Sequence, residues 1–337
     1  MKKTALVIAL SLTCASAAAF DLGNPTNNDT SNLVWTGHIS PDTDTVTSAI
    51  AAAHIYGGQA VVPEQINPES TFVLEYCKTQ TPPVLNDFSG KKVGLVDFNQ
   101  KTQLQKTIDE SSIVAIVDHH AIGGQPVNLS QVATLDIRPW GSAATILADR
   151  AEKMGKVLSK QVACTTLAGI LSDTVVLESP TTTEYDHKYA KSLAKQAGIK
   201  DLHDFGQKML IAKSDLSHLS ALEILTMDYK NFEFSGKKVG IGVAETLTAD
   251  QLIARKDEFI QAMQAHKKAK GLDHLFFSVT DTKNKQANLI WIDAADAKVA
   301  QQAFQHSEID AWLTLPGVTS RKRQIGPSIQ KAVASLN

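Results

Sequence analysis

The sequence has few cysteines, no excess of charge of one sign and no long hydrophobic run. Three cysteines occur in 337 residues, too few for a disulfide scaffold. Lys and Arg number 33 against 35 Asp and Glu, which excludes a general electrostatic attraction to nucleic acid. Apolar residues make up 43% of the chain, so its length and composition are sufficient for two globular domains.

Residues 1–19 are predicted to be a cleavable signal peptide. Two lysines precede an apolar run at 5–12, which is too short to span a bilayer, and small residues follow it. We expect cleavage near Ala17 to Ala19. The mature chain is then expected to be periplasmic or secreted, with no stable membrane span.

Loss of Cys14 with the signal leaves Cys77 and Cys164 in the mature chain. They could form a disulfide in an oxidising compartment, but we expect two half-buried thiols. Neither is flanked by a histidine or a second cysteine at ligand spacing, which argues against a thiolate metal site.

The pattern predicts an α/β protein of two domains, 20–213 and 221–337, joined by a linker at 214–220. Strands alternating with helices in the larger N-terminal domain indicate a parallel sheet with helices on both faces. Its expected strands are 33–36, 59–62, 93–96 and 113–117, and its expected helices are 43–56, 71–78, 142–153, 159–171 and 184–197.

The smaller C-terminal domain is also expected to be α/β, and the active site is expected in the cleft between the domains. Its expected strands are 238–243, 274–280 and 287–292, and its expected helices are 248–267 and 325–336.

Acidic and imidazole groups follow several of the expected strands. These groups are His38, Asp97, Asp118, His119 and His120. A single such residue is more often a helix cap or a hydrogen-bonded structural group. Together, however, they fall where the carboxyl ends of parallel strands form a ligand crevice.

Further carboxylates at Asp42, Asp44 and Asp173 complete a mixed set without thiolate, which suits Mn²⁺, Co²⁺, Mg²⁺ or catalytic Zn²⁺. Two such ions about 3.5–4 Å apart can share a carboxylate and a bridging water, which becomes a hydroxide nucleophile.

Basic side chains in the C-terminal part are candidates for binding phosphate. The run 320–324 contains two arginines and a lysine, and Lys230 lies further upstream. Arginine binds phosphate oxygens through a bidentate fork, whereas lysine acts as a point charge. By itself, a basic run is equally typical of a solvated surface.

Six motifs occur in order from about Leu33 to the C-terminus. They are Gly37-His38-x-x-Pro41-Asp42-Thr43-Asp44-Thr45, Val96-Asp97, Asp118-His119-His120, Gly141-Ser142-Ala143-Ala144-Thr145, Leu171-Ser172-Asp173-Thr174 and Ser320-Arg321-Lys322-Arg323-Gln324. In combination they resemble the family II inorganic pyrophosphatases, the manganese-dependent branch of the DHH phosphoesterase superfamily. The resemblance implies hydrolysis of pyrophosphate to two orthophosphates.

The resemblance also implies a role for each site residue. His38 and Asp42 would bind one metal ion, Asp44, His119 and Asp173 the other, and Asp97 both; His120, Lys230, Arg321 and Lys322 would contact substrate and act in catalysis. The expected cofactors are two Mn²⁺, with Co²⁺ or Mg²⁺ as alternatives. The expected partner is pyrophosphate rather than nucleic acid, and a homodimer is left open.

Three features depart from the family pattern. Phe98 and Gln100 stand where relatives carry a histidine and a glutamate, and Trp140 replaces a small aliphatic residue. We expect the first two to alter metal affinity without abolishing activity, since the ligands are intact. The signal peptide is the third departure, because most relatives are cytoplasmic.

Two other functions are weighed against this one. Another DHH phosphoesterase would act on short polyphosphate or oligonucleotides, although the Gly-rich, His-containing motif expected for oligonucleotide cleavage is missing from the second domain. An exported metal- or phosphate-binding protein would carry the same groups without turnover. Release of phosphate from each substrate separates the three.

Overall fold

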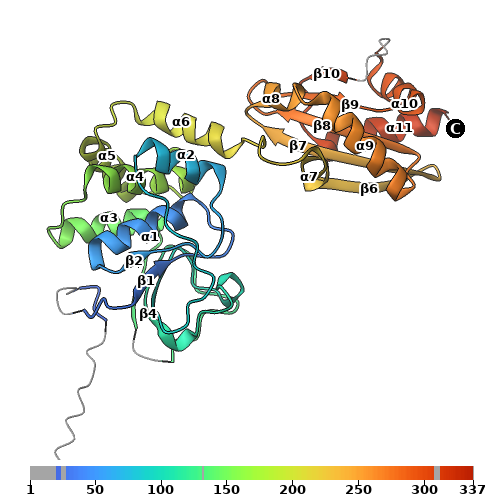
Figure 1. Cartoon of the computed structure of the whole chain (residues 1–337). Helices are drawn as coiled ribbons and strands as arrows, with labels where there is room; N and C mark the ends of the chain where they lie inside the picture. Colours follow the sequence, from blue (N-terminus) through green and yellow to red (C-terminus); the bar gives the residue numbers. More distant parts are fainter. Residues whose placement is uncertain (1–19, 24–27, 131–132, 307–311, 337) are drawn as a thin grey trace, which may run out of the picture. The chain divides into compact units, whose positions relative to one another are not determined.

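The computed structural model describes residues 20–23, 28–130, 133–306 and 312–336, and the predicted signal peptide lies outside them. The chain divides into two compact units on either side of the bond between Gly206 and Gln207 (Figure 1). This division falls inside helix α6 (Leu202–Lys213) and not in the linker expected at 214–220. Among the described helices, none is long and apolar enough to cross a membrane.

The first unit contains a five-stranded sheet in the order β2-β1-β3-β4-β5, with every pair parallel. The strands are β1 (Leu33–Thr36), β2 (Gln59–Ala60), β3 (Lys92–Val96), β4 (Ile113–Asp118) and β5 (Thr134–Ile137). The predicted parallel sheet is therefore confirmed. The short edge strand β5 was not predicted, and β2 is shorter than expected.

Helices cover one face of this sheet in layers. They are α1 (Thr43–Tyr56), α2 (Pro68–Tyr76), α3 (Ala143–Lys153), α4 (Lys160–Asp173) and α5 (Glu184–Ala197). Helix α1 packs on β1 to β3 and α3 on β4, while α4 packs on α1 and α5 on α4.

The opposite face is covered by irregular segments and two short 3₁₀ helices, η2 (Lys101–Gln103) and η3 (Glu110–Ser112). Phe88, Ile108 and Val127 from these segments pack on Val93 and Leu95 of β3. The expectation of helices on both faces is thus wrong for this face, because isolated apolar residues in loops complete the core there.

The second unit contains a mixed sheet in the order β10-β9-β8-β7-β6, in which only β7 and β8 run parallel. Its strands are β6 (Asp228–Phe234), β7 (Lys237–Thr246), β8 (His274–Asp281), β9 (Gln286–Ile290) and β10 (Trp312–Pro316). The predicted smaller α/β domain is confirmed, although β6 and β10 were not predicted.

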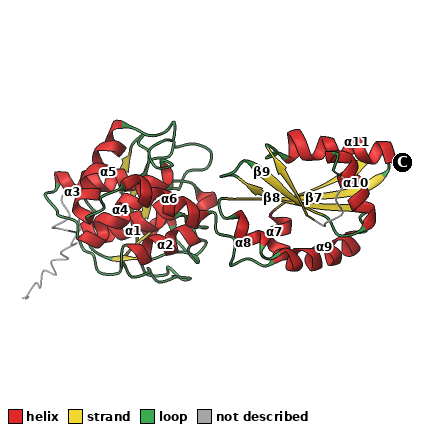
Figure 2. Cartoon of the chain, turned by 90° about the horizontal axis from the view of Figure 1, so that it is seen from above, coloured by secondary structure: helices red, strands yellow, loops and turns green. Residues whose placement is uncertain are grey.

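Helices pack on both faces of this second sheet (Figure 2). One face carries α7 (Ala221–Met227), α8 (Ala249–Ile253) and α9 (Lys256–Lys270), and the other carries α10 (Ala294–Phe304) and α11 (Gly326–Leu336). The single helix expected over 248–267 is two helices, because the chain turns at Ala254 and Arg255. A π-helical turn, η4 (Arg321–Ile325), precedes α11.

The expectation of two free thiols is wrong, because Cys77 and Cys164 form a disulfide. Cys77 caps the C-terminus of α2, and Cys164 lies in the second turn of α4. Their Cα atoms are 5.6 Å apart, inside the range that a disulfide spans. The pairing depends on a contact between residues 87 positions apart, which local sequence patterns do not reveal.

Candidate metal centre and phosphate-binding residues

The turn between β1 and α1 supplies His38 and Asp42, and the first turn of α1 supplies Asp44. Gly37 is required there, because a Cβ atom at this position would lie 2.2 Å from the Thr45 methyl group. Asp42 caps α1 by accepting a hydrogen bond from the Thr45 amide. The His38 Nδ1 contacts the Ile39 carbonyl oxygen at 2.7 Å, which leaves Nε2 directed at Asp42 and Asp97 at 3.6 and 3.7 Å.

Asp97 lies at the centre of the cluster, immediately after β3. Its backbone adopts a left-handed φ of 68°, which is uncommon for a residue with a side chain and is typical of functional sites. Its carboxylate is buried, and Oδ2 accepts a hydrogen bond from the Thr45 hydroxyl at 2.7 Å. The other oxygen, Oδ1, lies 3.2 Å from His119 Nε2.

His119 and Asp173 come from two further elements. The Nδ1 of His119 contacts the Trp140 carbonyl at 3.0 Å, so that Nε2 faces Asp97 and lies 3.3 Å from Asp173 Oδ2. Such a backbone contact fixes the orientation of a metal-binding imidazole. Asp173 is the last residue of α4.

Asp44 is fully buried beside the same groups. Its carboxylate accepts hydrogen bonds from the amides of Ala143 and Ala144, at the N-terminus of α3, and from the Ser48 hydroxyl. The helix dipole of α3 therefore favours its negative charge.

The structure brings all six expected metal ligands together in the first unit. Their ligand atoms form overlapping groups in which every member lies within 4.8 Å of the others. One group is His38, Asp42 and Asp97, a second is Asp44, Asp97, His119 and Asp173, and a third is Asp97, His119 and His120. Asp97 belongs to all three groups.

The electrostatics of the cluster fit bound cations. Burial and the neighbouring Asp173 carboxylate raise the pKa of Asp44 to about 7. Burial and Asp44 likewise raise the pKa of Asp97 well above its ordinary value. Burial opposes charge on His119, but the Asp173 and Asp97 carboxylates outweigh it and raise the pKa of His119 to about 12. These carboxylates repel one another, and a cation removes that repulsion.

Unsatisfied polar atoms support the same conclusion. Asp97 Oδ1 and His119 Nε2 are buried, and although they lie 3.2 Å apart, neither forms a hydrogen bond of acceptable geometry with the described residues. A buried polar atom without a partner is costly, and a coordinated metal ion would satisfy both atoms. The residues present therefore fit a metal centre.

A buried carboxylate that was not among the predicted ligands orients the two histidines. Asp118 Oδ1 accepts hydrogen bonds from the His119 and His120 amides and lies 2.9 Å from His120 Nδ1. Its Oδ2 accepts one from Asn99, which itself accepts one from Gln100. The motif Asp-His-His indicated Asp118, but its sequence did not distinguish a ligand from an orienting group.

The residues that depart from the family pattern lie close to these ligands. Phe98 is fully buried, and its ring meets the His38 imidazole edge-on at 6.3 Å between centroids. Gln100 supports Asn99, whereas Trp140 supports His119 through its backbone carbonyl. The effect of Phe98 and Gln100 on metal affinity stays a prediction.

The expected phosphate-binding residues are divided between the two units. His120 is in the first unit, where its side chain is 52% exposed beside the cluster. Lys230 is an exposed residue of β6, and Lys322 is exposed on η4. Arg321 binds the carboxylate and backbone carbonyl of Asp228, two residues before Lys230.

Gln324, in the basic motif, folds the chain before Arg321. Its side-chain oxygen accepts hydrogen bonds from the Thr319 and Ser320 amides, and its nitrogen donates one to the Gly317 carbonyl. Gln324 therefore has a structural role, whereas the basic residues before it carry the charge of the motif.

Comparison with known proteins gives the same family that the six sequence motifs resemble. The N-terminal domain model of the DHH family matches residues 32–170, and the DHHA2 domain model matches 207–332. A manganese-dependent inorganic pyrophosphatase from Methanocaldococcus jannaschii is 34% identical over 304 residues, covering 88% of this chain and 97% of the relative. One from Methanothrix thermoacetophila is 37% identical, covering 89% and 98%.

The chain belongs to the manganese-dependent inorganic pyrophosphatase family. A solved structure of a Methanococcus jannaschii protein assigned to the family II inorganic pyrophosphatases agrees, with a TM-score of 0.57 at 33% identity. It covers 89% of this chain and 99% of the other. The resemblance inferred from the six motifs is thus confirmed.

Proposed function

We propose that this chain hydrolyses inorganic pyrophosphate with two Mn²⁺ bound at the cluster around Asp97. The observation that supports this most directly is the membership of Asp97 in every ligand group. One carboxylate common to two groups is the arrangement that a pair of neighbouring ions requires. The names of the relatives supply the metal and the substrate.

Each ion would be held by its own residues. His38 and Asp42 would bind one, while Asp44, His119 and Asp173 would bind the other. When bound, such a pair of ions lowers the pKa of a shared water and withdraws charge from phosphoryl oxygens. Trp140 and Asp118 keep the two imidazoles oriented for these contacts.

Four side chains are proposed to contact the substrate. His120, half exposed beside the ligands, can donate a hydrogen bond to a phosphate oxygen or take part in proton movement. Lys230, Arg321 and Lys322 would neutralise the phosphate groups. Their contact with pyrophosphate at the metal centre is part of the proposal.

We also propose that the mature chain works outside the cytoplasm. The signal-like pattern of 1–19 motivates this, and the Cys77–Cys164 disulfide supports it because disulfides persist mainly in oxidising compartments. Fractionation of cells that express the full chain, with mass determination of the mature N-terminus, tests it. Recovery of the uncleaved chain in the cytoplasm would contradict export.

The activity is tested by phosphate release from pyrophosphate, tripolyphosphate and a dinucleotide, each with Mn²⁺, Co²⁺ or Mg²⁺. We expect the fastest turnover on pyrophosphate with Mn²⁺. Preference for tripolyphosphate or the dinucleotide would favour another DHH phosphoesterase. Mn²⁺ binding without release from any substrate would favour the binding protein.

A further inference from the structure

A buried carboxylate outside the ligand set joins the two chain segments that carry most of the ligands. Glu69, in the first turn of α2, is fully buried. Its Oε2 accepts hydrogen bonds from the hydroxyls of Thr43 and Ser172, both at 2.9 Å. Thr43 stands between Asp42 and Asp44, and Ser172 directly precedes Asp173. Glu69 thus bridges the start of α1 to the end of α4.

The disulfide connects the opposite end of α2 to the opposite end of α4. Cys77 caps the C-terminus of α2, and Cys164 lies near the N-terminus of α4. The two helices therefore run antiparallel between two clamps. Cys77 lies eight positions after Glu69, and Ser172 lies eight positions after Cys164, which is about 12 Å along either helix axis. Equal spacing lets both clamps close on undistorted helices.

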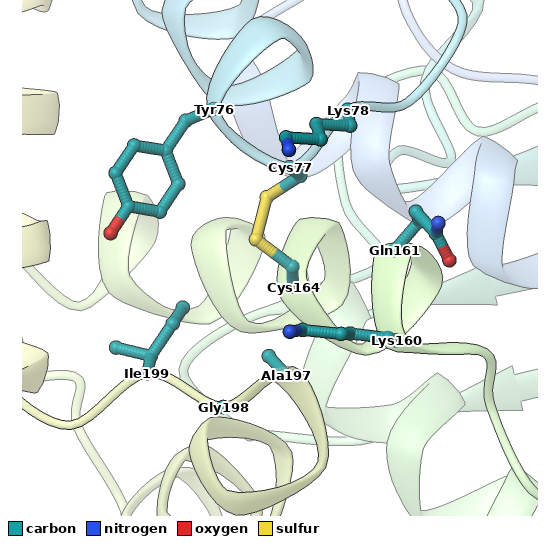
Figure 3. A pocket seen from close by; sticks show the side chains of 9 residues that line it. All are labelled: Tyr76, Cys77, Lys78, Lys160, Gln161, Cys164, Ala197, Gly198 and Ile199. Carbon is teal, nitrogen blue, oxygen red and sulfur yellow. A yellow bond between two sulfur atoms is a disulfide. The ribbon is translucent and has the colours of Figure 1, made fainter.

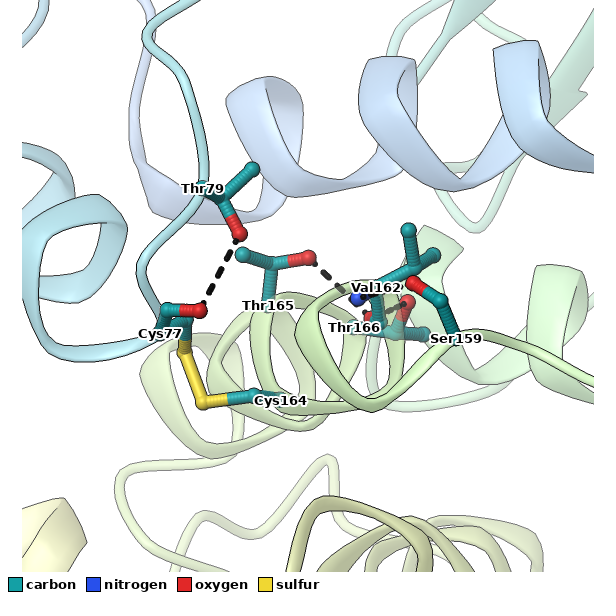
Figure 4. Close-up of a disulfide and its surroundings, with 7 residues drawn as sticks. All are labelled: Cys77, Thr79, Ser159, Val162, Cys164, Thr165 and Thr166. Carbon is teal, nitrogen blue, oxygen red and sulfur yellow. Dashed lines mark hydrogen bonds between the residues drawn. A yellow bond between two sulfur atoms is a disulfide. The ribbon is translucent and has the colours of Figure 1, made fainter.

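Helix α4 is regular next to the disulfide. Figure 4 shows the first turns of α4, where the Ser159 hydroxyl accepts a hydrogen bond from the Val162 amide and the Thr165 and Thr166 hydroxyls donate to the Val162 carbonyl. A shift of α4 at Cys164 relative to α2 would therefore reach Ser172, the residue of α4 that Glu69 holds.

The disulfide lines a pocket of about 470 Å³. Figure 3 shows the disulfide among the residues that line this pocket, which include Tyr76, Lys78, Lys160 and Ile199. A small reductant can therefore reach the disulfide from this pocket.

We propose that α2 positions the ligands of the metal centre, and that the Cys77–Cys164 disulfide, by clamping α2 to α4, raises the affinity of the centre for Mn²⁺. This rests on the proposed metal centre and adds a dependence on oxidation state to it. Glu69 is a positioning residue, since it acts through Thr43 and Ser172. Reduction leaves α2 held at this end by packing such as the stack of Tyr76 on Phe205, which permits small displacements.

The test compares Mn²⁺ dissociation constants of the metal-free full chain in its oxidised and reduced forms, by calorimetry at 20 °C. A water-soluble phosphine reduces the disulfide to two thiols and is itself oxidised to the phosphine oxide, with water supplying the oxygen and the two protons. We expect the Mn²⁺ dissociation constant to rise about tenfold on reduction, as for other groups that orient metal ligands.

Glu69 variants show whether the effect passes through α2. Glu69→Met keeps the volume but accepts no hydrogen bond from the two hydroxyls, so its affinity should be low in both oxidation states and change less than twofold on reduction. Glu69→Gln retains an oxygen that can accept both bonds and should restore the difference. If Glu69→Met does not fold, Ser172→Ala removes the clamp from the α4 side.

A double variant, Cys77→Ser with Cys164→Ser, is the matched control. It should bind Mn²⁺ like the reduced chain and be indifferent to the phosphine. Equal affinity of the oxidised and reduced chains, or an unchanged ratio in Glu69→Met, would overturn this proposal while leaving the proposed function intact. A chain that binds no Mn²⁺ in either state would overturn both.

Discussion

The two units each contain a five-stranded sheet, but they differ in where their charged groups lie and in how these groups are paired. In the first unit the strands are all parallel, and their carboxyl ends gather Asp44, Asp97 and His119 in a buried cluster with displaced pKa values. In the second unit the sheet is mixed, and Arg321 is already neutralised by Asp228. Strand direction accounts for the difference, because parallel strands bring successive strand ends to one edge.

The charged groups of the two units are therefore suited to different ligands. Buried carboxylates that repel one another are poised to bind cations, whereas exposed or exchangeable cations are suited to binding an anion. Changes to the ligand cluster of the first unit should therefore alter metal affinity, and changes to the basic residues of the second unit should alter the KM for pyrophosphate.

The largest effect is expected for Asp97→Asn. Removing a carboxylate that belongs to every ligand group should lower turnover by at least about 10³-fold, equivalent to about 4 kcal/mol. The metal-free variant should nevertheless unfold at a higher temperature, because burial and Asp44 oppose the charge of Asp97. Phosphate release and thermal unfolding measure the two effects.

The control for Asp97→Asn is Asp149→Asn, which alters another buried aspartate of the first unit. Burial opposes the charge of Asp149, but Arg138 outweighs it and lowers its pKa to about 2, so its loss should destabilise the fold by about 2 kcal/mol. Turnover at 20 °C should be unchanged. Near-normal turnover of Asp97→Asn would refute its shared role.

A second prediction concerns the pH dependence of the metal-free fold. Because the pKa of Asp44 is raised from 3.8 to about 7, its contribution to stability is full below pH 3.8 and is lost as the pH rises to about 7. The loss is at most about 4 kcal/mol. The raised pKa of His119 adds a loss of the same sign above pH 6.5.

Thermal unfolding between pH 4.5 and 7 measures this slope. The melting temperature should fall with rising pH in the presence of a chelator and rise with saturating Mn²⁺, since only ionised ligands bind the metal. Asp44→Asn should flatten the slope of the metal-free protein. A flat profile for the unaltered metal-free chain would contradict the prediction.

Much of the first unit could be predicted because its signals are local. The continuously apolar runs at 93–96 and 113–117 indicate buried parallel strands, and the acids that follow them are placed by topology alone. The contacts of Glu69 and the Cys77–Cys164 bridge could not be predicted, because each joins segments distant in sequence. A glutamate in a short helix gives no sign that it is buried.

The second unit was less predictable for a physical reason. Strand β6 reads as polar because much of it is exposed, so its sequence lacks the apolar run that identified β3. The basic motif suggested phosphate binding, but only the structure shows that Arg321 has an internal partner and that Gln324 folds the turn before it.

A third prediction tests the role assigned to the second unit. Arg321→Lys loses the planar fork that binds two phosphate oxygens at once, so the KM for pyrophosphate should rise about tenfold. The dissociation constant for Mn²⁺ should not change, in contrast to Asp97→Asn. A parallel loss of Mn²⁺ affinity would show that the two units do not divide the work as proposed.

The smallest effect is expected for Asp228→Asn. The Asp228 carboxylate is 58% exposed and is paired with the Arg321 guanidinium, so it would compete with the substrate proposed to bind there. Its neutralisation should lower the KM for pyrophosphate two- to threefold, consistent with the small free energies of exposed ion pairs. The backbone carbonyl of residue 228 would still accept a hydrogen bond from Arg321, so the arginine should keep its position. A higher KM would instead mean that the Asp228 carboxylate positions Arg321. The guanidinium would then be held in place before substrate binds, as the metal ligands of the first unit are held by their own neighbours.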